Sequence, residues 1–357
     1  MAETSSNNGG TDEVLVEESA SVRTFILNRP KQLNALTYQM GNGRAFCAGA
    51  DVTAIVHNVT GNWVLIILTS GTPYLCDGNT YSKPQVSILN GIVMGGGLGA
   101  SVHGRFRVAT EKSVCAMPET ALGLFPDAGA SFFYSRLPGF FGEYAGLTGA
   151  RLDGAEMLAC GLATHFVPSE RLPLLEQALA EGNTSDPDVI SAIISRFSNM
   201  PKLKAESPYH KMKIIDRCFS RRTIEEIISS LEIEALNKKD DWIFSTIQSL
   251  KKASPTSLKI SLRSIREGRL QGVGSCLIRE YRMVCHVLRG KFSKDYFEGC
   301  RAILIDKDRN PKWEPSRLEL ITDDDVERYF CKIDDEDWED LKLPPRSNLL
   351  PYAIAKL

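Results

Sequence analysis

The first half of the chain alternates short apolar runs with turns rich in glycine, proline and polar residues. Val14–Val16 and Val22–Leu27 flank a polar turn, which predicts a β-hairpin. Val86–Leu89 and Phe106–Ala109 are further apolar runs of strand length. From Arg151 onward the spacing of apolar residues becomes strongly helical. The pattern therefore predicts a mixed α/β part followed by a helical region.

Two segments of the first half hold little regular structure. Pro30 ends the run from the second strand, and a helix is expected to begin near Asn34. Only Thr37–Met40 follow before the turn residues that start at Gly41, so this helix has little room. The longest apolar run, Trp63–Leu68, is far too short to span a bilayer.

The helical region combines an ordinary core helix with a basic stretch. Thr223 and Glu226 make a capping box at a helix start. The apolar residues that follow at helical spacing are Ile224, Ile227, Ile228 and Leu231. We interpret this stripe as core. The basic residues downstream are Lys251, Lys252, Arg263, Arg266 and Arg269. A solvated face explains them at least as well as contact with ligand phosphates.

A glycine triplet follows the third predicted strand. Gly95, Gly96 and Gly97 have no Cβ atoms, so a ligand can approach their backbone closely. A helix that begins at the triplet would direct free N–H groups at developing negative charge, and such amides can form an oxyanion hole. The small residues of Ala45–Asp51 would present a second amide near Ala50.

Two carboxylates stand in apolar loop sequence after the triplet. Glu119 lies in the sequence MPET and Asp127 in FPD, and together they indicate a reaction centre. A structural role, such as capping the following helix, is the alternative for each acid. His103, in the helix behind the triplet, is interpreted as a packed or solvated residue rather than a catalytic one.

Length and composition limit the class of protein. The chain of 357 residues exceeds one ordinary core, so one domain of about 200 residues and a smaller one are expected. The hydrophobic fraction of 43% and the net charge of −2 suit a globular enzyme with no bulk attraction to nucleic acid or anionic membranes. The nine cysteines form no CxxC pair and the five histidines show no ligand spacing. We therefore expect no disulfide framework, no metal site and a reducing compartment.

Other familiar motifs fit poorly. Gly95–Ala100 satisfies the GxGxxA pattern of dinucleotide folds, but no second strand–helix–strand unit follows it. Asp306–Asn310 resembles the start of a calcium loop, yet Pro311 stands where that loop needs glycine and Arg317 where it needs glutamate. The sequence contains neither a GxSxG elbow nor a phosphate-binding GxxxxGKS/T loop.

The ends of the chain carry their own signals. Residues 1–12 are polar, resemble no signal or transit peptide and are expected to be disordered. Ala355-Lys356-Leu357 follows the small-basic-leucine pattern of a peroxisomal address, so we expect a peroxisomal protein that binds the import receptor, with the cytosol as the alternative. Between the ends we expect a core over residues 13–200, a helical region over 201–340 and a tail over 341–357.

Four motifs, in order, resemble the crotonase superfamily of acyl-CoA enzymes. They are LNRPKQLNAL (27–36), GRAFCAGAD (43–51), NGIVMGGGLG (90–99) and MPETALGLFPDAGAS (117–131). SVHGRFRVAT and LIDKDRNPKW (304–313) are similar to the 3-hydroxyisobutyryl-CoA hydrolase branch, and the Ala-Lys-Leu ending is similar to its peroxisomal plant members. The resemblance extends from Val14 to Trp313.

The resemblance implies an α/β fold in which ββα turns stack in a spiral, with a helical C-terminal region and an acyl-CoA threaded between turns. It implies that the amides of Ala50 and Gly96 hold the thioester oxygen. The other residues that it places at the substrate are Gly49, Asp51, Gly95 and Gly97. No cofactor is implied, because CoA is part of the substrate.

The same resemblance assigns chemistry to the two acids. Glu119 would attack the thioester to give an anhydride, or activate water to do so. Asp127 would hold the 3-hydroxyl group or assist proton transfer. Enoyl-CoA hydratases resemble this sequence but carry a second glutamate where this chain has Gly99, so hydration is disfavoured. The implied reaction is hydrolysis of 3-hydroxyisobutyryl-CoA in valine breakdown. The alternative is a CoA-binding or assembly protein that kept the fold.

The chain departs from this family after Met40. Relatives place a long helix and a buried strand between the NAL and GRAF motifs, where this chain has only Thr37–Met40. The stretch Trp63–Asn79 also lacks a family segment that supplies an acidic side chain to the acyl pocket. We therefore predict an internal deletion, as in a shortened splice form or an imperfect gene model.

Overall fold

A computed structural model describes residues 14–19, 22–27, 45–47, 84–336 and 338–343. Several predictions fall outside these residues and stay predictions. They concern the polar N-terminus, the helix near Asn34, the amide near Ala50, the deletion after Met40 and the tripeptide Ala355-Lys356-Leu357.

The described strands form a hairpin and two larger sheets. The strands are β1 (Val14–Ser19), β2 (Val22–Leu27), β3 (Ala45–Cys47), β4 (Val86–Leu89), β5 (Ile92–Met94), β6 (Phe106–Ala109), β7 (Val114–Ala116), β8 (Leu152–Asp153) and β9 (His165–Phe166). β1 and β2 pair antiparallel, with Val14 opposite Leu27, which confirms the predicted hairpin. One sheet has the order β3-β5-β7-β8 and the other β4-β6-β9.

From β3 to β7, consecutive strands alternate between the two larger sheets. β4 and β6 pair in parallel in one sheet, while β5 and β7 pair in parallel in the other. The corner between β4 and β5 contains Gly91, whose φ of 107° suits glycine. At this corner the side-chain oxygen of Asn90 accepts a hydrogen bond from the Thr110 hydroxyl of the next turn, at 3.0 Å. The turns therefore stack on one another, which confirms the predicted ββα spiral.

Helices cover this spiral and make up the C-terminal part. Up to residue 200 they are α3 (Gly96–Val102), η2 (Glu119–Leu122), α4 (Ala130–Tyr134), α5 (Phe141–Thr148), α6 (Gly154–Cys160), η3 (Ser169–Arg171), α7 (Leu172–Gly182) and α8 (Pro187–Phe197). The later ones are η4 (Pro208–Lys211), α9 (Met212–Phe219), α10 (Ile224–Asn237), α11 (Asp241–Lys252), α12 (Pro255–Gly268), α13 (Val273–Arg289), α14 (Asp295–Cys300), η5 (Arg301–Ile305), η6 (Leu318–Leu320) and α15 (Asp323–Arg328). The capping box of Thr223 and Glu226 begins α10 as predicted.

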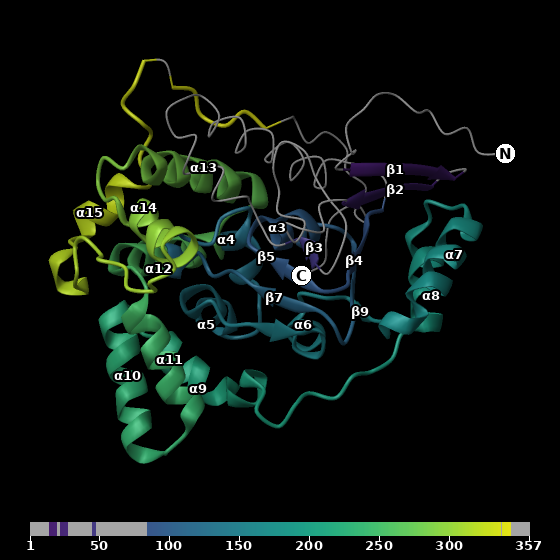
Figure 1. The fold of residues 1–357 in the computed structure, drawn as a ribbon, viewed down its shortest axis with the longest axis horizontal. Coiled ribbons are helices and arrows are strands. Elements are labelled where there is room, and N and C mark those ends of the chain that lie inside the picture. Colours follow the sequence, from purple (N-terminus) through teal and green to yellow (C-terminus); the bar gives the residue numbers. More distant parts are fainter. Residues whose placement is uncertain (1–13, 20–21, 28–44, 48–83, 337, 344–357) are drawn as a thin grey trace.

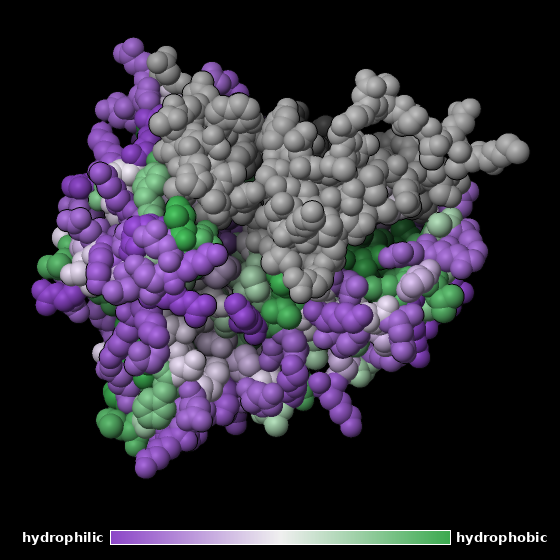
Figure 2. Space-filling view, viewed as in Figure 1, coloured by the Kyte–Doolittle hydropathy of each residue, from purple (hydrophilic) through white to green (hydrophobic). Residues whose placement is uncertain are grey.

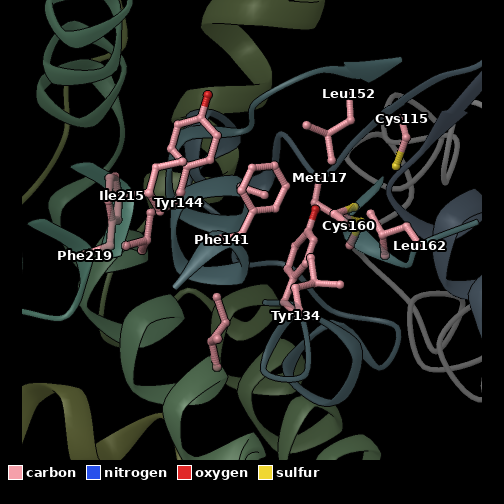
Figure 3. Close-up of a cluster of buried hydrophobic side chains, with 14 of the residues drawn as sticks. Cys115, Met117, Tyr134, Phe141, Tyr144, Leu152, Cys160, Leu162, Ile215 and Phe219 are labelled. Atoms are coloured by element: carbon pink, nitrogen blue, oxygen red, sulfur yellow. The ribbon is translucent and has the colours of Figure 1, made fainter. Parts of the chain in front are cut away.

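The main hydrophobic core joins the spiral to the helices that follow it. Figure 3 shows Cys115 of β7, Tyr134 of α4, Phe141 of α5 and Phe219 of α9 among the side chains that fill it, and all four are buried. Because these residues come from both halves of the chain, the helical region is packed onto the spiral rather than separate from it.

A second core cluster lies between the spiral and the last helices. Phe125, which stands between the two candidate acids in sequence, is fully buried there with Met283 of α13 and Tyr296 of α14. Figure 1 shows α12, α13 and α14 gathered beside α4. The segment that carries Glu119 and Asp127 is therefore held where the C-terminal helices meet the spiral.

Two helix pairs extend from this body at opposite sides. α7 with α8 and α10 with α11 stand apart from the sheets in Figure 1. The visible surface of the described residues is mostly hydrophilic, with apolar surface over α10 and α11 (Figure 2). The large apolar side chains that these two helices expose are Ile233, Leu236 and Phe244. Within the described residues no helix has the length and apolarity needed to cross a bilayer.

Arg107 of β6 is a buried cation that donates hydrogen bonds to backbone carbonyls. Its guanidinium is 1% exposed and donates to the carbonyls of Gly104, Gly161 and Leu162 at 2.9, 3.2 and 2.8 Å. Burial lowers the pKa of Arg107 to about 10. The bonds to Gly161 and Leu162 satisfy carbonyls at the end of α6, where the helix has no donors of its own to offer.

Replacing Arg107 by methionine is expected to destabilise the protein by about 2 to 4 kcal/mol. The change leaves buried carbonyls without donors at about 1 to 3 kcal/mol each, and the loss of a desolvated charge offsets part of this cost. Urea denaturation measures the free energy of unfolding. The matched control is Arg151→Met at an exposed position, expected to change stability by less than about 0.5 kcal/mol. Equal stability of the two variants would contradict the assignment.

Candidate active site

The glycine triplet forms the turn from β5 into α3. Gly95 has a φ of 51° and donates its N–H to the carbonyl of Ala116 in β7 at 3.1 Å. Its carbonyl accepts the first helical bonds, from the amides of Leu98 and Gly99. The earlier amides of the helix, including that of Gly96, have no acceptor within α3 because they belong to its first turn. Gly96 thus lies in the first turn of α3, and its role as a donor in the oxyanion hole stays a prediction.

The other half of that hole is outside the described residues. β3 ends at Cys47 and pairs in parallel with β5, which leads to the triplet. Gly49, Ala50 and Asp51 follow β3 directly and are not described. The pairing of the Ala50 and Gly96 amides therefore stays a prediction.

Glu119 is a buried carboxylic acid, and within the described part of the chain one of its oxygens accepts no hydrogen bond. It begins η2, and its side chain is only 6% exposed. Among the residues that the structure describes, its Oε2 atom has no hydrogen-bond partner. Burial raises the pKa of Glu119 well above its usual range, and repulsion from Asp127 raises it further. Such an acid is suited to act as a nucleophile or a base rather than as a structural anchor.

The turn that carries this acid is held by three helices. The Thr120 hydroxyl donates to the carbonyl of Leu147 in α5 at 3.1 Å. The Thr120 carbonyl accepts the N–H of Ser254, just before α12, at 3.1 Å. Gly123 ends the turn with a φ of 74°, and a Cβ there would stand 2.2 Å from the carbonyl of Asp295 in α14. Contacts made by Thr120 and Gly123 therefore fix the place of the acid.

Asp127 lies on the loop between η2 and α4, close enough to Glu119 for their charges to interact. Burial raises the pKa of Asp127 to about 7, with a further contribution from the charge of Glu280 in α13. Its backbone carbonyl accepts the N–H of Ala130, while its side chain does not cap α4. Neither acid is a helix cap, because η2 also has no side-chain cap. The structure therefore brings the two predicted acids together and removes the capping alternative.

Gly99 of α3 is in direct contact with the Asp127 loop. A Cβ on Gly99 would stand 2.4 Å from the Cβ of Ala128 and 2.7 Å from its carbonyl oxygen. Real Cβ atoms do not approach so closely, so the loop occupies the space that a side chain at Gly99 would need. The absence of a glutamate at this position is thus built into the packing of the loop.

Other residues that the sequence singled out have structural partners. His103 is 3% exposed, and its Nε2 atom lies 3.3 Å from the carbonyl oxygen of Ala128, which agrees with a packed residue. Arg266 donates to the carbonyls of Phe219 and Arg222, and Arg269 binds the Glu143 carboxylate at 2.8 Å.

Tyr296 of α14 is a site neighbour that sequence reasoning missed. Burial raises its pKa well above the usual range, and the charges of Cys300, Asp127 and Glu119 add to the rise. Its hydroxyl therefore stays neutral beside the two acids. The sequence gives no signal for it, because a tyrosine in a short helix far from the motifs is an ordinary core residue.

Known proteins match this architecture over almost the whole chain. The family model for enoyl-CoA hydratase/isomerase matches residues 40–330. The chain belongs to this enoyl-CoA hydratase/isomerase family. One solved relative is a carnitinyl-CoA dehydratase from Mycobacterium thermoresistibile. Its crystal structure superposes with a TM-score of 0.81 at 31% identity, covering 91% of this chain and 98% of that one. The family and fold implied by the four motifs are confirmed.

Two curated relatives of this family member come from Arabidopsis thaliana. The 3-hydroxyisobutyryl-CoA hydrolase 1 is 62% identical over 371 positions, covering 97% of this chain and 98% of that protein. The small ribosomal subunit protein mS47 is 43% identical over 363 positions, covering 93% of this chain and 88% of that protein. One relative is thus named for a hydrolase and the other for a ribosomal component.

Proposed function

We propose that this family member hydrolyses the thioester of 3-hydroxyisobutyryl-CoA, or of a similar short 3-hydroxyacyl-CoA, to the free acid and CoA. The relative named for that activity is 62% identical over nearly the full length of both chains. The observation that carries hydrolysis over hydration is the contact between Gly99 and Ala128, which leaves no space for a second glutamate. The remaining acids are Glu119 and Asp127, a pair suited to acyl transfer.

In the proposed reaction the amides of Gly96 and Ala50 bind the thioester oxygen. Attack on the carbonyl carbon moves negative charge to that oxygen, and each preorganised donor contributes on the order of 3 kcal/mol to stabilising it. Collapse of the tetrahedral intermediate breaks the C–S bond and expels the CoA thiolate, which takes up a proton.

Two routes lead to that intermediate, and Glu119 serves in both. As a nucleophile its carboxylate forms a mixed anhydride with the acyl group, and water then hydrolyses the anhydride. As a general base it removes a proton from the water that attacks the thioester directly. Asp127 binds the 3-hydroxyl group of the substrate or passes the proton onward. No cofactor enters either route.

The cellular setting belongs to the same proposal. The motif Ala355-Lys356-Leu357 supports import into the peroxisome through the import receptor. The name of the 3-hydroxyisobutyryl-CoA hydrolase relative supports a role of the proposed reaction in valine breakdown.

The proposed deletion after Met40 has support from length. The alignment with the hydrolase relative runs over 371 positions, more than the 357 residues of this chain, so the relative has residues that this chain lacks. Loss of an interior strand would leave backbone groups unpaired at about 1 to 3 kcal/mol each. A cooperative unfolding transition together with full turnover would show that the deletion does not matter.

The second candidate function is assembly without catalysis. The relative named as a small ribosomal subunit protein, at 43% identity, supports the idea that this fold can serve in a complex. A chain of this kind would keep CoA binding or a docking surface and show no turnover.

A thiol-release assay on 3-hydroxyisobutyryl-CoA separates these functions. The proposed hydrolase releases CoA from 3-hydroxyisobutyryl-CoA at a rate proportional to the enzyme concentration. It releases CoA from crotonyl-CoA far more slowly, and it does not hydrate crotonyl-CoA. Hydration of crotonyl-CoA without thiol release would overturn hydrolysis. Absence of both activities, with CoA binding retained in calorimetry, would establish the assembly protein instead.

Replacing Asp127 by asparagine is expected to move the acid limb of the pH profile to lower pH. Repulsion from Asp127 contributes to the raised pKa of Glu119, so its removal lowers that pKa and ionises Glu119 at lower pH. The measurement is kcat/KM from pH 4 to pH 9. An acid limb that stays in place, whatever the height of the plateau, would contradict coupling between the acids.

A further inference from the structure

The loop that carries Asp127 has a conformation that its own sequence does not favour. Ala128 and Gly129 both have positive φ, at 56° and 86°. The left-handed conformation costs a residue such as alanine about 1 to 2 kcal/mol. A Cβ on Gly129 would stand 2.3 Å from Nε2 of His103. A loop of this kind persists only where its surroundings hold it.

Glu280 of α13 holds this loop in place, although it lies 151 residues further along the chain than Gly129. Its Oε2 atom accepts the N–H of Gly129 at 2.6 Å. Its Oε1 atom accepts the N–H and the hydroxyl of Ser131 at 2.8 and 2.5 Å. The carboxylate is 2% exposed, so these bonds are shielded from water. One side chain thus satisfies two of the backbone donors at the start of α4, which has no side-chain cap of its own.

The neighbouring Arg279 completes the network. Its Nη2 atom donates to the Ser131 hydroxyl at 2.8 Å and to the carbonyl of Ser264 in α12 at 2.9 Å. The hydroxyl therefore accepts from the guanidinium and donates to Glu280, which fixes its orientation. Both charged residues are almost fully buried, so the network is rigid and has few alternative arrangements.

We propose that Glu280 is a positioning residue for the thioester hydrolysis proposed above: from α13 it holds loop 127–131 and sets where the Asp127 carboxylate stands relative to Glu119. It touches no substrate atom in this role. Its effect reaches the reaction through the backbone of Gly129, two residues after Asp127.

The same placement brings the charge of Glu280 close enough to Asp127 to affect its pKa. The titratable or charged groups around Asp127 and its loop are Glu119 of η2, Glu280 and Arg279 of α13, Tyr296 of α14 and His103 of α3. Burial is the main cause that raises the pKa of Asp127 to about 7, and the charge of Glu280 is the next. Removing that charge favours the ionised form of Asp127 and lowers its pKa.

The test variant is Glu280→Gln. The amide keeps one acceptor oxygen and turns an N–H₂ group toward a backbone N–H, so one bond to the loop is lost. We expect kcat to fall about 10²-fold, as for a misplacement of about 1 Å, with a smaller change in KM. We also expect the pKa of Asp127, followed by carbon-13 NMR of the labelled carboxyl group, to fall below 7.

Two further variants separate positioning from folding. Ser131→Ala removes one of the three bonds and keeps the charge of Glu280, so kcat should fall less while the pKa of Asp127 stays. Glu267→Gln is the matched control, because Glu267 pairs with Arg279 at 3.7 Å and, among the described residues, its side chain makes no hydrogen bond to the loop. It should leave kcat and the pKa unchanged.

The outcomes decide between the two proposals. A folded Glu280→Gln protein with wild-type kcat and an unchanged Asp127 pKa would overturn the role of Glu280, and a lower melting temperature alone would show a purely structural role. If wild type releases no thiol, the proposed hydrolysis fails. The NMR pKa of Asp127 then still tests whether Glu280 governs this carboxylate.

Discussion

Replacing Glu119 by glutamine is expected to lower kcat for thioester hydrolysis about 10³-fold, within the range that a positioned acid–base group contributes. Glutamine keeps the shape of the side chain but cannot attack the thioester or take a proton from water. Because η2 is held through contacts of Thr120 and Gly123, the variant should keep its fold. Steady-state thiol release from 3-hydroxyisobutyryl-CoA measures the loss.

The same variant is expected to become more stable relative to wild type as pH rises. Burial raises the folded-state pKa of Glu119 above its value in the unfolded chain. Below the unfolded pKa both states are protonated and the acid costs nothing. As pH rises from the unfolded pKa through the folded pKa, the unfolded chain releases a proton that the folded protein still holds, so the wild type loses folding stability. The glutamine variant has no such proton and does not lose stability in this way. Melting temperatures at pH 5 and pH 8 therefore diverge in favour of the variant.

The control for Glu119 is Glu111→Gln. Glu111 lies in the turn before β7, and its carboxylate accepts the N–H of Ser169 at 2.9 Å on the protein surface. This variant should keep wild-type turnover. Turnover that persists in Glu119→Gln would refute the role of Glu119, whereas equal losses in both variants would point to a general effect on folding.

Elements with a clear period were predictable from the sequence. β6 spans Phe106–Ala109, as its apolar run predicts, and α10 begins at the capping box of Thr223. β5, β7, β8 and β9 have two or three residues each, too few to show the alternation of a strand. They exist because pairing with strands distant in sequence satisfies their backbone groups. That information lies in the fold rather than in the local sequence.

The candidate site likewise has residues that the sequence predicts and residues that it does not. Glu119 and Asp127 are candidates from the sequence alone, because two acids in apolar loop sequence are unusual. Glu280 was missed because it lies in a charged helical stretch about 150 residues downstream, where a solvated face is the usual interpretation. One signal was present: Val273, Cys276, Leu277 and Glu280 recur at helical spacing on the buried side of α13. A charged residue on the apolar face of a helix needs a buried partner, and the partner here is the Asp127 loop.

Replacing Gly99 by glutamate, the residue that the resemblance places there in enoyl-CoA hydratases, is expected to lower the kcat of thioester hydrolysis about 10²-fold without creating a hydratase. Even a Cβ would stand 2.4 Å from the Cβ of Ala128 and 2.7 Å from its carbonyl oxygen. The loop must therefore move, and a displaced Asp127 should cost about 10²-fold in kcat. Forcing a side chain into this packed contact should also cost about 1 to 3 kcal/mol of stability or more.

The matched control for Gly99→Glu is Ala100→Glu, one position further along α3. Ala100 is exposed, so a glutamate there enters water and both activity and stability should stay near wild type. Thiol release, crotonyl-CoA hydration and melting temperature are measured for both variants. Hydration by a Gly99→Glu protein with an unchanged melting temperature would show that the loop yields easily. In that case the packing of Ala128 against Gly99 would not be what separates hydrolysis from hydration in this chain.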